Sequence, residues 1–496
     1  MKRTNYSLLF VLGASLLLSL QFCPPFDRPS TDKEFFQYTG MAILKGQVPY
    51  RDFFDHKPPV FFFINSAGLI LGNGPWGLWL ISTLFALLIS FLLFRAGRQY
   101  KLPYPWLLPL LFNLMIRDFL VIGTINLIRE CSTFFVMLFF CAFLSRHRLR
   151  LFLLGFLTAL VFFTQQEQVF QLIPFLLYAL LVRERLHVSA RFARMIAGFL
   201  PIPLLLLLYF AIHGSLRYFW EDVYVFNVKY YIQEYKSIGD HFRTCKRVLD
   251  EGNYELPFMI AVVLGITSLI LPHRKKILLL TSLITLFLSL SAEWLGGRQK
   301  GTGVLQDPFT YFVPLSASVC IVLFIVFAFT EARFLTDRYA QLPYALLLCC
   351  SLVYTSLQHL THLKRRADDP LFGGAEMNYL RQQPLKDYQL YVLFDQEYTF
   401  CYNEKKILAP SPWVYQHFWQ WYGNWDPGHH LLDSIAGDLL RHRTTYIIMP
   451  AEGLNKVIDD SNRRWWSSFM QEHYRPVPLP GSPASILWRL KESDDK

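Results

Sequence analysis

Apolar segments and short charged connections alternate along most of the chain. Segments of this length and polarity are typical of helices that cross a bilayer. We expect about eleven crossings, at 5–22, 76–94, 103–117, 130–145, 151–166, 169–182, 195–213, 257–271, 276–292, 309–330 and 342–360. The apolar segment 58–72 is short and runs into Gly-Asn-Gly-Pro, which predicts an interfacial helix rather than a crossing.

The charge of the connections predicts which side of the membrane each one faces. The connections 95–101, 146–150, 183–194, 273–276 and 331–338 are short and basic, whereas 23–75, 118–129, 214–256 and 293–308 are longer and carry both signs. Cytoplasmic loops are enriched in Lys and Arg, so we expect the first group inside and the second outside. The first span follows Lys2 and Arg3, which predicts a cytoplasmic N-terminus, and an odd number of crossings predicts a C-terminus beyond the inner (plasma) membrane. No small-residue cleavage site follows this span, so we expect it to be retained.

The last part of the chain has a different pattern. Short apolar runs at 388–395, 444–450 and 485–490 indicate strands, and 428–442 indicates an amphipathic helix. We therefore expect two domains. A mainly helical transmembrane module would occupy 1–364, with its first outer loop at 23–75, and a soluble α/β domain would occupy 365–496 on the outer face.

The composition excludes several classes of protein. The chain is 53% hydrophobic with a mean hydropathy of +0.28, which is too apolar for a soluble enzyme of this size. The net charge of +11 fits basic cytoplasmic loops, and the scatter of basic residues among the spans argues against nucleic-acid binding. The eight cysteines show no spacing typical of zinc sites. A disulfide among Cys23, Cys245 and Cys401 is left open.

The polar stretch 27–59 lies beside the membrane and is rich in ionisable side chains. They are Asp27, Arg28, Asp32, Glu34, Arg51, Asp52, Asp55, His56 and Lys57. Such groups next to a bilayer usually build a functional site. Thr31 and Glu34 have the spacing of a capping box, which predicts a helix with Asp32 in its first turn and with Gly46 as its stop. We expect Arg51 and Asp52 to pair within the loop.

This stretch resembles the first outer loop of GT-C membrane glycosyltransferases. The motifs are Asp32-x-Glu34, Tyr38-x-Gly40, Leu44-x-Gly46-x-x-Pro49-Tyr50-Arg51-Asp52 and Asp55-His56-Lys57-Pro58-Pro59. The branch most similar to it is the bacterial one related to protein O-mannosyltransferases and to the aminoarabinose transferase of lipid A. The resemblance implies transfer of a sugar from a polyprenyl-phosphate donor to an acceptor hydroxyl on the outer face of the membrane.

The resemblance also implies roles for residues of this loop. Asp32 matches the essential acid of the family, and a carboxylate there would take the acceptor proton. Lys57 would hold the donor phosphate, and Asp55 and His56 would line the site. Each also has a plainer interpretation: Asp32 as an acid favoured at a helix N-terminus, and Lys57 as a side chain reaching the headgroups. Lys33 stands where many members carry a second acid, and His56 where some carry Glu.

Later segments supply further candidates. Glu130, at the outer end of the fourth span, resembles the second carboxylate of the family, with a partner role for Arg129 or Arg117 as the alternative. Gln166 either faces the cavity or bonds a helix end. In the loop 293–308 and the start of the tenth span, Arg298 would reach the phosphate and Tyr311 would line the site, although Thr310 stands where relatives carry His.

The sequence thus predicts an inverting glycosyltransferase that uses a polyprenyl-phosphate sugar, with a lipid glycan, polysaccharide or protein as acceptor. No metal is required, because the cations are side chains, although a divalent ion near Asp32 and Glu130 stays open. A transporter or flippase of lipid-linked sugars, an O-antigen-ligase-type transferase and a non-catalytic assembly protein are the alternatives. The sequence names neither the sugar nor the acceptor.

Overall fold

The computed structural model describes the N-terminal helices and most of the C-terminal region. The described residues are 2–27, 30–72, 74–100, 105–116, 125–182, 186–231, 281, 284, 375–393, 396–414, 416, 430–450, 460–479 and 485–491. The crossings expected at 257–271, 309–330 and 342–360 lie outside them, as does nearly all of 276–292.

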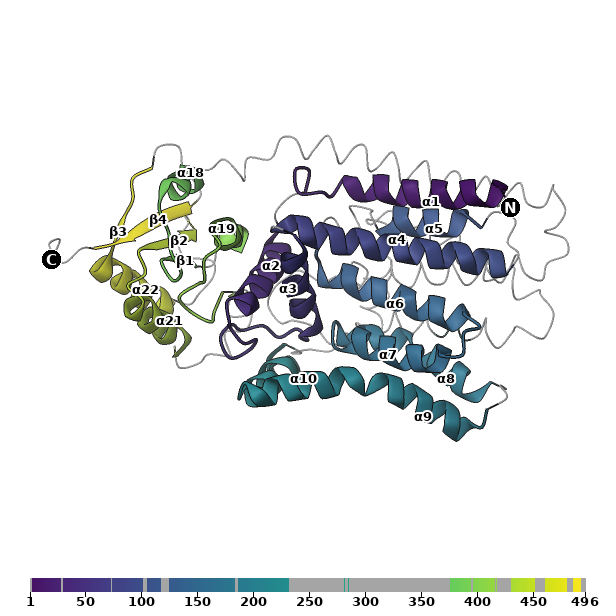
Figure 1. Ribbon diagram of the computed structural model, residues 1–496. Coiled ribbons are helices and arrows are strands. Elements are labelled where there is room, and N and C mark those ends of the chain that lie inside the picture. Colours follow the sequence, from purple (N-terminus) through teal and green to yellow (C-terminus); the bar gives the residue numbers. More distant parts are fainter. Residues whose placement is uncertain are drawn as a thin grey trace, which may run out of the picture.

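The apolar segments of the first half form a bundle of helices. They are α1 (Lys2–Leu20), α4 (Pro75–Gln99), α5 (Leu107–Ile116), α6 (Ile128–Leu144), α7 (Arg150–Phe162), α8 (Ile173–Leu181), α9 (Val188–Phe199) and α10 (Pro201–Ile212). Figure 1 shows them lying side by side, with the N-terminus at the end of the bundle away from the C-terminal sheet. Every crossing expected before residue 214 coincides with one of these helices. Within the described residues, Pro75–Gln99 and Val188–Ile212 are long and apolar enough to cross a membrane.

One expected connection is partly wrong. The basic stretch 183–194 was expected to be a loop, but α9 begins at Val188 and continues into α10. Two causes are visible. Arg191 is buried and donates hydrogen bonds to the carbonyls of Val182 (2.6 Å) and Ala179 (3.4 Å) at the end of α8. Gly198 packs so closely on α7 that a Cβ there would lie 2.0 Å from the Phe152 carbonyl oxygen.

Two shorter helices lie between the bundle and the C-terminal sheet (Figure 1). These are α2 (Thr31–Leu44) and α3 (Val60–Leu71). They approach closely at Gly40, where a Cβ would lie 2.7 Å from the Asn65 carbonyl carbon. The predicted stop of α2 is confirmed: Gly46 has φ +92°, and its N–H donates to the Ile43 carbonyl.

After α10 the chain turns and packs back against the outer loop. The turn at Gly214 (φ +64°) leads into α11 (Leu216–Trp220) and then into two π-helical turns, η2 (Glu221–Val225) and η3 (Asn227–Tyr231). A short 3-10 helix, η1 (Gln166–Gln171), separates α7 from α8.

The C-terminal residues form a mixed sheet with helices around it. The strands β1 (Leu390–Val392), β2 (Tyr446–Pro450), β3 (Tyr474–Pro476) and β4 (Ser485–Leu490) have the order β1-β2-β4-β3. β1 pairs with β2 in parallel, whereas β4 pairs with β2 and with β3 in antiparallel fashion. The helices are α18 (Ala375–Gln382), α19 (Phe400–Lys405), α21 (His430–Arg441) and α22 (Asp460–His473), with η7 (Gln396–Thr399) before α19.

The predicted strands and amphipathic helix of this region are present as β1, β2, β4 and α21. Leu432 and Ile435 of α21 pack with Trp466 of α22 in one buried cluster. The sequence pattern did not predict α22 or β3. Helix α22 is polar on average, so its buried face does not stand out in the sequence, and β3 has only three residues. Cys23 and Cys401 are both free and buried, so the pairing left open between them is not formed. Cys245 lies outside the described residues.

Candidate functional site

The expected lysine packs against α2, the helix that carries the expected acid in its first turn. Asp32 is half-buried, and Phe36 follows it one turn later on the same face of the helix. The Lys57 ammonium lies over the Phe36 ring, 5.2 Å from its centroid. The charge of Asp32 also acts on Asp55, where it is one of the causes of a raised pKa. Lys57 therefore packs on the helix that carries Asp32, next to Asp55.

Asp55 builds the turn that presents Lys57. The carboxyl is fully buried, and its Oδ1 accepts hydrogen bonds from the backbone N–H groups of His56 (2.7 Å) and Lys57 (3.3 Å). The Lys57 ammonium lies 3.7 Å from the same oxygen. Burial raises the pKa of the Asp55 carboxyl, although the Lys57 charge and these hydrogen bonds oppose the shift. Its Oδ2 is buried and has no hydrogen-bond partner in the described part of the chain.

The rest of the loop holds this turn against α3. Pro58 and Pro59 follow Lys57 directly, and Pro59 is the N-cap of α3. The Tyr50 hydroxyl donates a 2.8 Å hydrogen bond to the Lys57 carbonyl. The Lys57 side chain keeps 18% of its surface exposed. A rigid backbone thus carries a cation that solvent or a ligand can reach.

The expected pairing of Arg51 with Asp52 is confirmed. Arg51 Nη2 lies 2.8 Å from Asp52 Oδ2, and Arg51 Nε lies 2.9 Å from Oδ1, so the pair is bidentate. Asp52 also accepts a hydrogen bond from the Val48 N–H. These contacts close the loop and leave neither side chain in the group formed by Asp32 and Lys57.

Two further polar residues of this region come from the segment 214–256, which was expected only to be an outer connection. Asn227 Oδ1 lies 2.7 Å from His56 Nδ1, and its Nδ2 donates to the His56 carbonyl at 2.8 Å. Burial lowers the pKa of the buried His56 well below its usual value. Burial, with the nearby Asp55 and Glu221 charges, raises the pKa of Asp222 to about 8. The polar residues of the aromatic run Phe219–Tyr231 were the available signal, but the partner of Asn227 is 171 residues away in the sequence.

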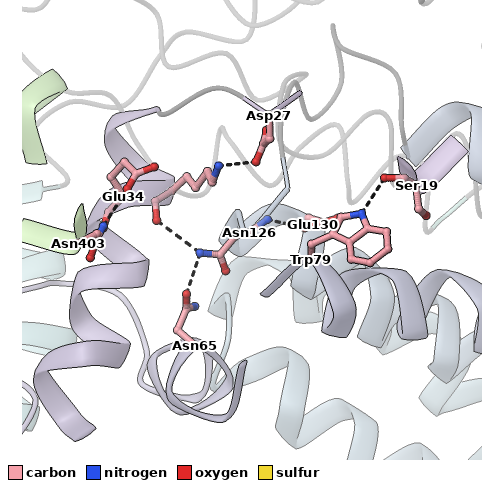
Figure 2. Close-up of polar contacts among 9 residues, drawn as sticks. Ser19, Asp27, Glu34, Asn65, Trp79, Asn126, Glu130 and Asn403 are labelled. Atoms are coloured by element: carbon pink, nitrogen blue, oxygen red, sulfur yellow. Dashed lines mark hydrogen bonds and ion pairs between the residues drawn. The ribbon is translucent and has the colours of Figure 1, made fainter. Parts of the chain in front are cut away.

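Glu130 is buried, and Figure 2 shows it next to Asn126. Its Oε1 accepts a 2.6 Å hydrogen bond from the Ser82 hydroxyl, and its Oε2 accepts a 2.8 Å hydrogen bond from the Asn126 N–H. The Asn126 side chain in turn donates to Asn65 Oδ1 (2.7 Å) and to the Lys33 carbonyl (3.4 Å). Through Asn126, Glu130 therefore connects α6 and α4 to the residue next to Asp32.

Lys33, which stands where many relatives carry an acid, has a different task here. Its ammonium forms a buried ion pair with Asp27 (Figure 2). Nearby, the Trp79 indole N–H donates a 2.8 Å hydrogen bond to the Ser19 carbonyl at the end of α1. A buried charge is retained only where it is paired, so this ion pair ties the chain before α2 to the helix itself.

The capping-box expectation for Glu34 is wrong. The N-cap of α2 is Ser30, and no side chain caps the helix. Glu34 instead faces the C-terminal region: the Asn403 amide of α19 donates 2.8 Å hydrogen bonds to both its carbonyl and its Oε2 (Figure 2). Burial raises the pKa of this carboxyl, and the hydrogen bond from Asn403 opposes the shift. The tertiary partner replaces the local one.

Further contacts hold the C-terminal region against the loop. The Tyr38 hydroxyl accepts a hydrogen bond from the Ala409 N–H (3.1 Å), and the Phe54 N–H donates to the Pro412 carbonyl (3.0 Å). Phe54 directly precedes Asp55. The C-terminal region therefore contacts both α2 and the turn that carries Lys57.

The remaining candidates fall in different places. The Val60 N–H donates to the Phe163 carbonyl (3.0 Å), which brings the segment containing Gln166 next to the start of α3. Gln166 Nε2 is buried and has no hydrogen-bond partner among the residues with described positions. Arg298 and Tyr311 lie outside the described residues.

Comparison with known proteins identifies the fold. Residues 56–217 match the family model described as dolichyl-phosphate-mannose-protein mannosyltransferase. A crystal structure of ArnT from Cupriavidus metallidurans bound to undecaprenyl phosphate superposes with a TM-score of 0.63 at 12% sequence identity, covering 99% of each chain. The chain has a GT-C fold. ArnT in the apo state gives a TM-score of 0.62 at 13% identity over 98% of each chain.

Other comparisons add little. A crystal structure of the Archaeoglobus fulgidus oligosaccharyltransferase, tethered with an acceptor peptide, gives a TM-score of 0.49 at 12% identity, covering 99% of this chain and 75% of that one. No curated protein matches the chain.

The similarity to the two ArnT structures confirms the expected GT-C resemblance and the polytopic, mainly helical fold. The family match begins at His56, so it includes Lys57, Glu130 and Gln166 but not Asp32.

Proposed function

We propose that this GT-C protein is an inverting glycosyltransferase that moves a sugar from a polyprenyl-phosphate donor to an acceptor hydroxyl on the outer face of the inner membrane. The observation that carries the proposal is the position of Lys57 over Phe36, beside the face of α2 that presents Asp32. A base and a phosphate-binding cation are the two groups that such a transfer requires. The undecaprenyl phosphate bound in the similar ArnT structure supports a lipid phosphate as the donor group.

The proposed reaction follows from these two side chains. Asp32 takes the proton of the acceptor hydroxyl while the acceptor oxygen forms a bond to the anomeric carbon. The bond between that carbon and the phosphate oxygen breaks from the opposite side, which inverts the configuration. The phosphate leaves with an additional negative charge, and the Lys57 ammonium stabilises it. The products are the glycosylated acceptor, polyprenyl phosphate and a protonated Asp32.

Asp55 orients the cation in this scheme. Its Oδ1 is 3.7 Å from the Lys57 ammonium, a distance too long for a hydrogen bond but still within the range of an ion pair. The pair therefore directs the ammonium without forming a tight hydrogen bond to it. His56 and Gln166 line the same region, and Arg298 and Tyr311 remain predicted contributors from a part of the chain outside the described residues.

Glu130 would contribute to the reaction by holding other residues in position. Both of its oxygens accept hydrogen bonds, from Ser82 and Asn126, so the carboxylate is directed into the bundle. By holding Asn126 against the Lys33 carbonyl, it would fix the first turn of α2 and with it the direction of Asp32. The proposed steps use no metal. A divalent ion near Asp32 and Glu130 would have to displace these hydrogen bonds, and the described residues contain no group of three His, Cys, Asp or Glu side chains that could hold one.

The test is a transfer assay with mass spectrometry. Membrane glycolipids and envelope glycans would be compared with and without the protein, and a shift of one sugar would identify the donor and acceptor classes. Asp32→Asn should abolish the shift, whereas Asp433→Asn, which changes an acid in the first turn of α21, should not. A flippase would move the lipid-linked sugar without forming a new glycosidic bond. Near-normal transfer by Asp32→Asn would remove Asp32 as the base.

A further inference from the structure

The π-helical segment after α11 has an unusual relation to the Asp55-His56-Lys57 motif. Asp222 and Asn227 are five residues apart and would point about 140° apart on an α-helix with 3.6 residues per turn. In a π-helix, which bonds residue i to i+5, such residues lie on the same side. Besides burial, the charge of Asp55 raises the pKa of Asp222, and Asn227 forms a hydrogen bond with His56. The π-helical winding is what brings both to one motif, and π-helical turns are frequent at functional sites.

Aromatic contacts seat this segment on the loop. The Phe219 ring packs on Tyr50 with centroids 5.6 Å apart, and the Phe226 ring packs on Phe54 at 5.3 Å and on His56 at 5.9 Å. Phe219 and Phe226 are both buried. The segment is therefore a fixed wall of the loop, and its polar residues are held in place beside the motif.

The hydrogen bonds of Asn227 define the state of His56. The Asn227 amide has two N–H donors, and it uses them on the carbonyls of His56 (2.8 Å) and Val223 (2.7 Å). Its Oδ1 must then accept, so His56 Nδ1 carries the proton of the 2.7 Å hydrogen bond. Burial keeps the ring neutral. Asn227 thus fixes both the backbone and the tautomer of the residue before Lys57.

Asn227 also completes the hydrogen bonding of the turn. Asp55 Oδ1 satisfies the N–H groups of His56 and Lys57, and the Tyr50 hydroxyl satisfies the Lys57 carbonyl. The remaining carbonyl, that of His56, is held by Asn227. All four backbone polar groups of the two residues are therefore bonded to side chains, and one of these bonds comes from the π-helical wall.

We propose that Asn227 is a positioning residue for the donor phosphate, acting by fixing the turn from which Lys57 binds it. This proposal rests on the proposed function, because it assumes that Lys57 contacts a lipid phosphate. Without Asn227 the His56 carbonyl loses its partner, the turn gains freedom, and the ammonium loses its defined position. The sugar and the acceptor hydroxyl would be unaffected, so the donor and acceptor sides of the reaction should respond differently.

The experiment measures equilibrium binding of undecaprenyl phosphate to the purified full-length protein. Asn227→Ala should weaken binding about 10-fold, since it removes partly buried hydrogen bonds that each contribute on the order of a few-fold or more. It should raise the KM for the donor and leave the KM for the acceptor unchanged. The matched control is Asn113→Ala: Asn113 is buried inside the bundle, and like Asn227 it donates two side-chain hydrogen bonds, to Ser90 (2.6 Å) and to the carbonyl four residues before it (2.7 Å).

A double mutant separates positioning from a general structural effect. If Asn227 acts through Lys57, the variant Lys57→Ala/Asn227→Ala should bind no more weakly than Lys57→Ala alone. Additive losses, unchanged binding by Asn227→Ala, or an equal loss in Asn113→Ala would each overturn the proposal. If Asn227→Ala does not fold, Asn227→Asp serves, since it keeps the side-chain shape but cannot donate to the His56 carbonyl. If Lys57→Ala itself binds normally, the proposed function fails instead.

Discussion

The contact between Asn403 and Glu34 predicts how strongly the C-terminal region holds α2. Asn403→Ala removes two 2.8 Å hydrogen bonds, one to the Glu34 carbonyl and one to its carboxyl. A neutral hydrogen bond contributes about 1 kcal/mol and one to a charged group about 1.5–3 kcal/mol, so opening this contact should become easier by about 2–4 kcal/mol. Since 1.4 kcal/mol is about tenfold in an equilibrium constant, this is about 30-fold to nearly 1,000-fold.

Hydrogen exchange followed by mass spectrometry measures this opening directly. Peptides from α2 and α19 should exchange faster in Asn403→Ala by that factor, whereas peptides from α4 and α7 should not change. Asn378→Ala is the control, because Asn378 is an exposed asparagine on α18 of the same C-terminal region; it accepts a 3.4 Å hydrogen bond from Arg381 of its own helix. Transfer activity should fall with the loss of α2 protection, because Asp32 lies on that helix.

The effect should also depend on pH. Burial raises the pKa of the Glu34 carboxyl, so ionisation of this group destabilises the fold as pH rises through its ordinary pKa. Asn403 opposes the raised pKa by bonding the carboxyl. Its removal should therefore cost more at neutral than at acidic pH. An Asn403→Ala variant with unchanged exchange in α2, or with a cost that is larger in acid, would refute this reasoning.

Three other predictions follow from the site. Lys57→Ala should weaken binding of undecaprenyl phosphate at least about tenfold, while acceptor binding measured by KM stays within about twofold, since removing a charged partner costs about 1.5–3 kcal/mol. Because the pKa of Asp222 is raised to about 8, its carboxyl gains a negative charge as pH passes that value; phosphate binding should then weaken, and Asp222→Asn should bind equally at pH values on either side of it. Gly40→Ala should lower the thermal midpoint, because its Cβ would lie 2.7 Å from the Asn65 backbone, whereas Gly437→Ala, with nothing within 4 Å, should not.

The sequence of the first loop predicted several of its structural features correctly, because those features depend on residues close together in the sequence. The start of α2, its stop at Gly46 and the pairing of Arg51 with Asp52 depend on neighbouring residues, and all three are present. The apolar segments likewise gave the helices of the bundle, because a crossing needs only a continuous apolar run. The family motifs in the same loop singled out Asp32 and Lys57 as candidates.

Other features depended on partners far along the chain. Glu34 has capping-box spacing, but it bonds Asn403, which is 369 residues away, because burial against α19 supplies a donor that the helix end does not. Asn227 and Asp222 reach the Lys57 turn through π-helical winding, and no sequence period indicates that winding. Thus the chain by itself determined its membrane segments, its polar loop and the chemistry available there. Only tertiary packing decided which of those polar groups meet, because a buried polar group takes the partner that packing places beside it, however distant in sequence.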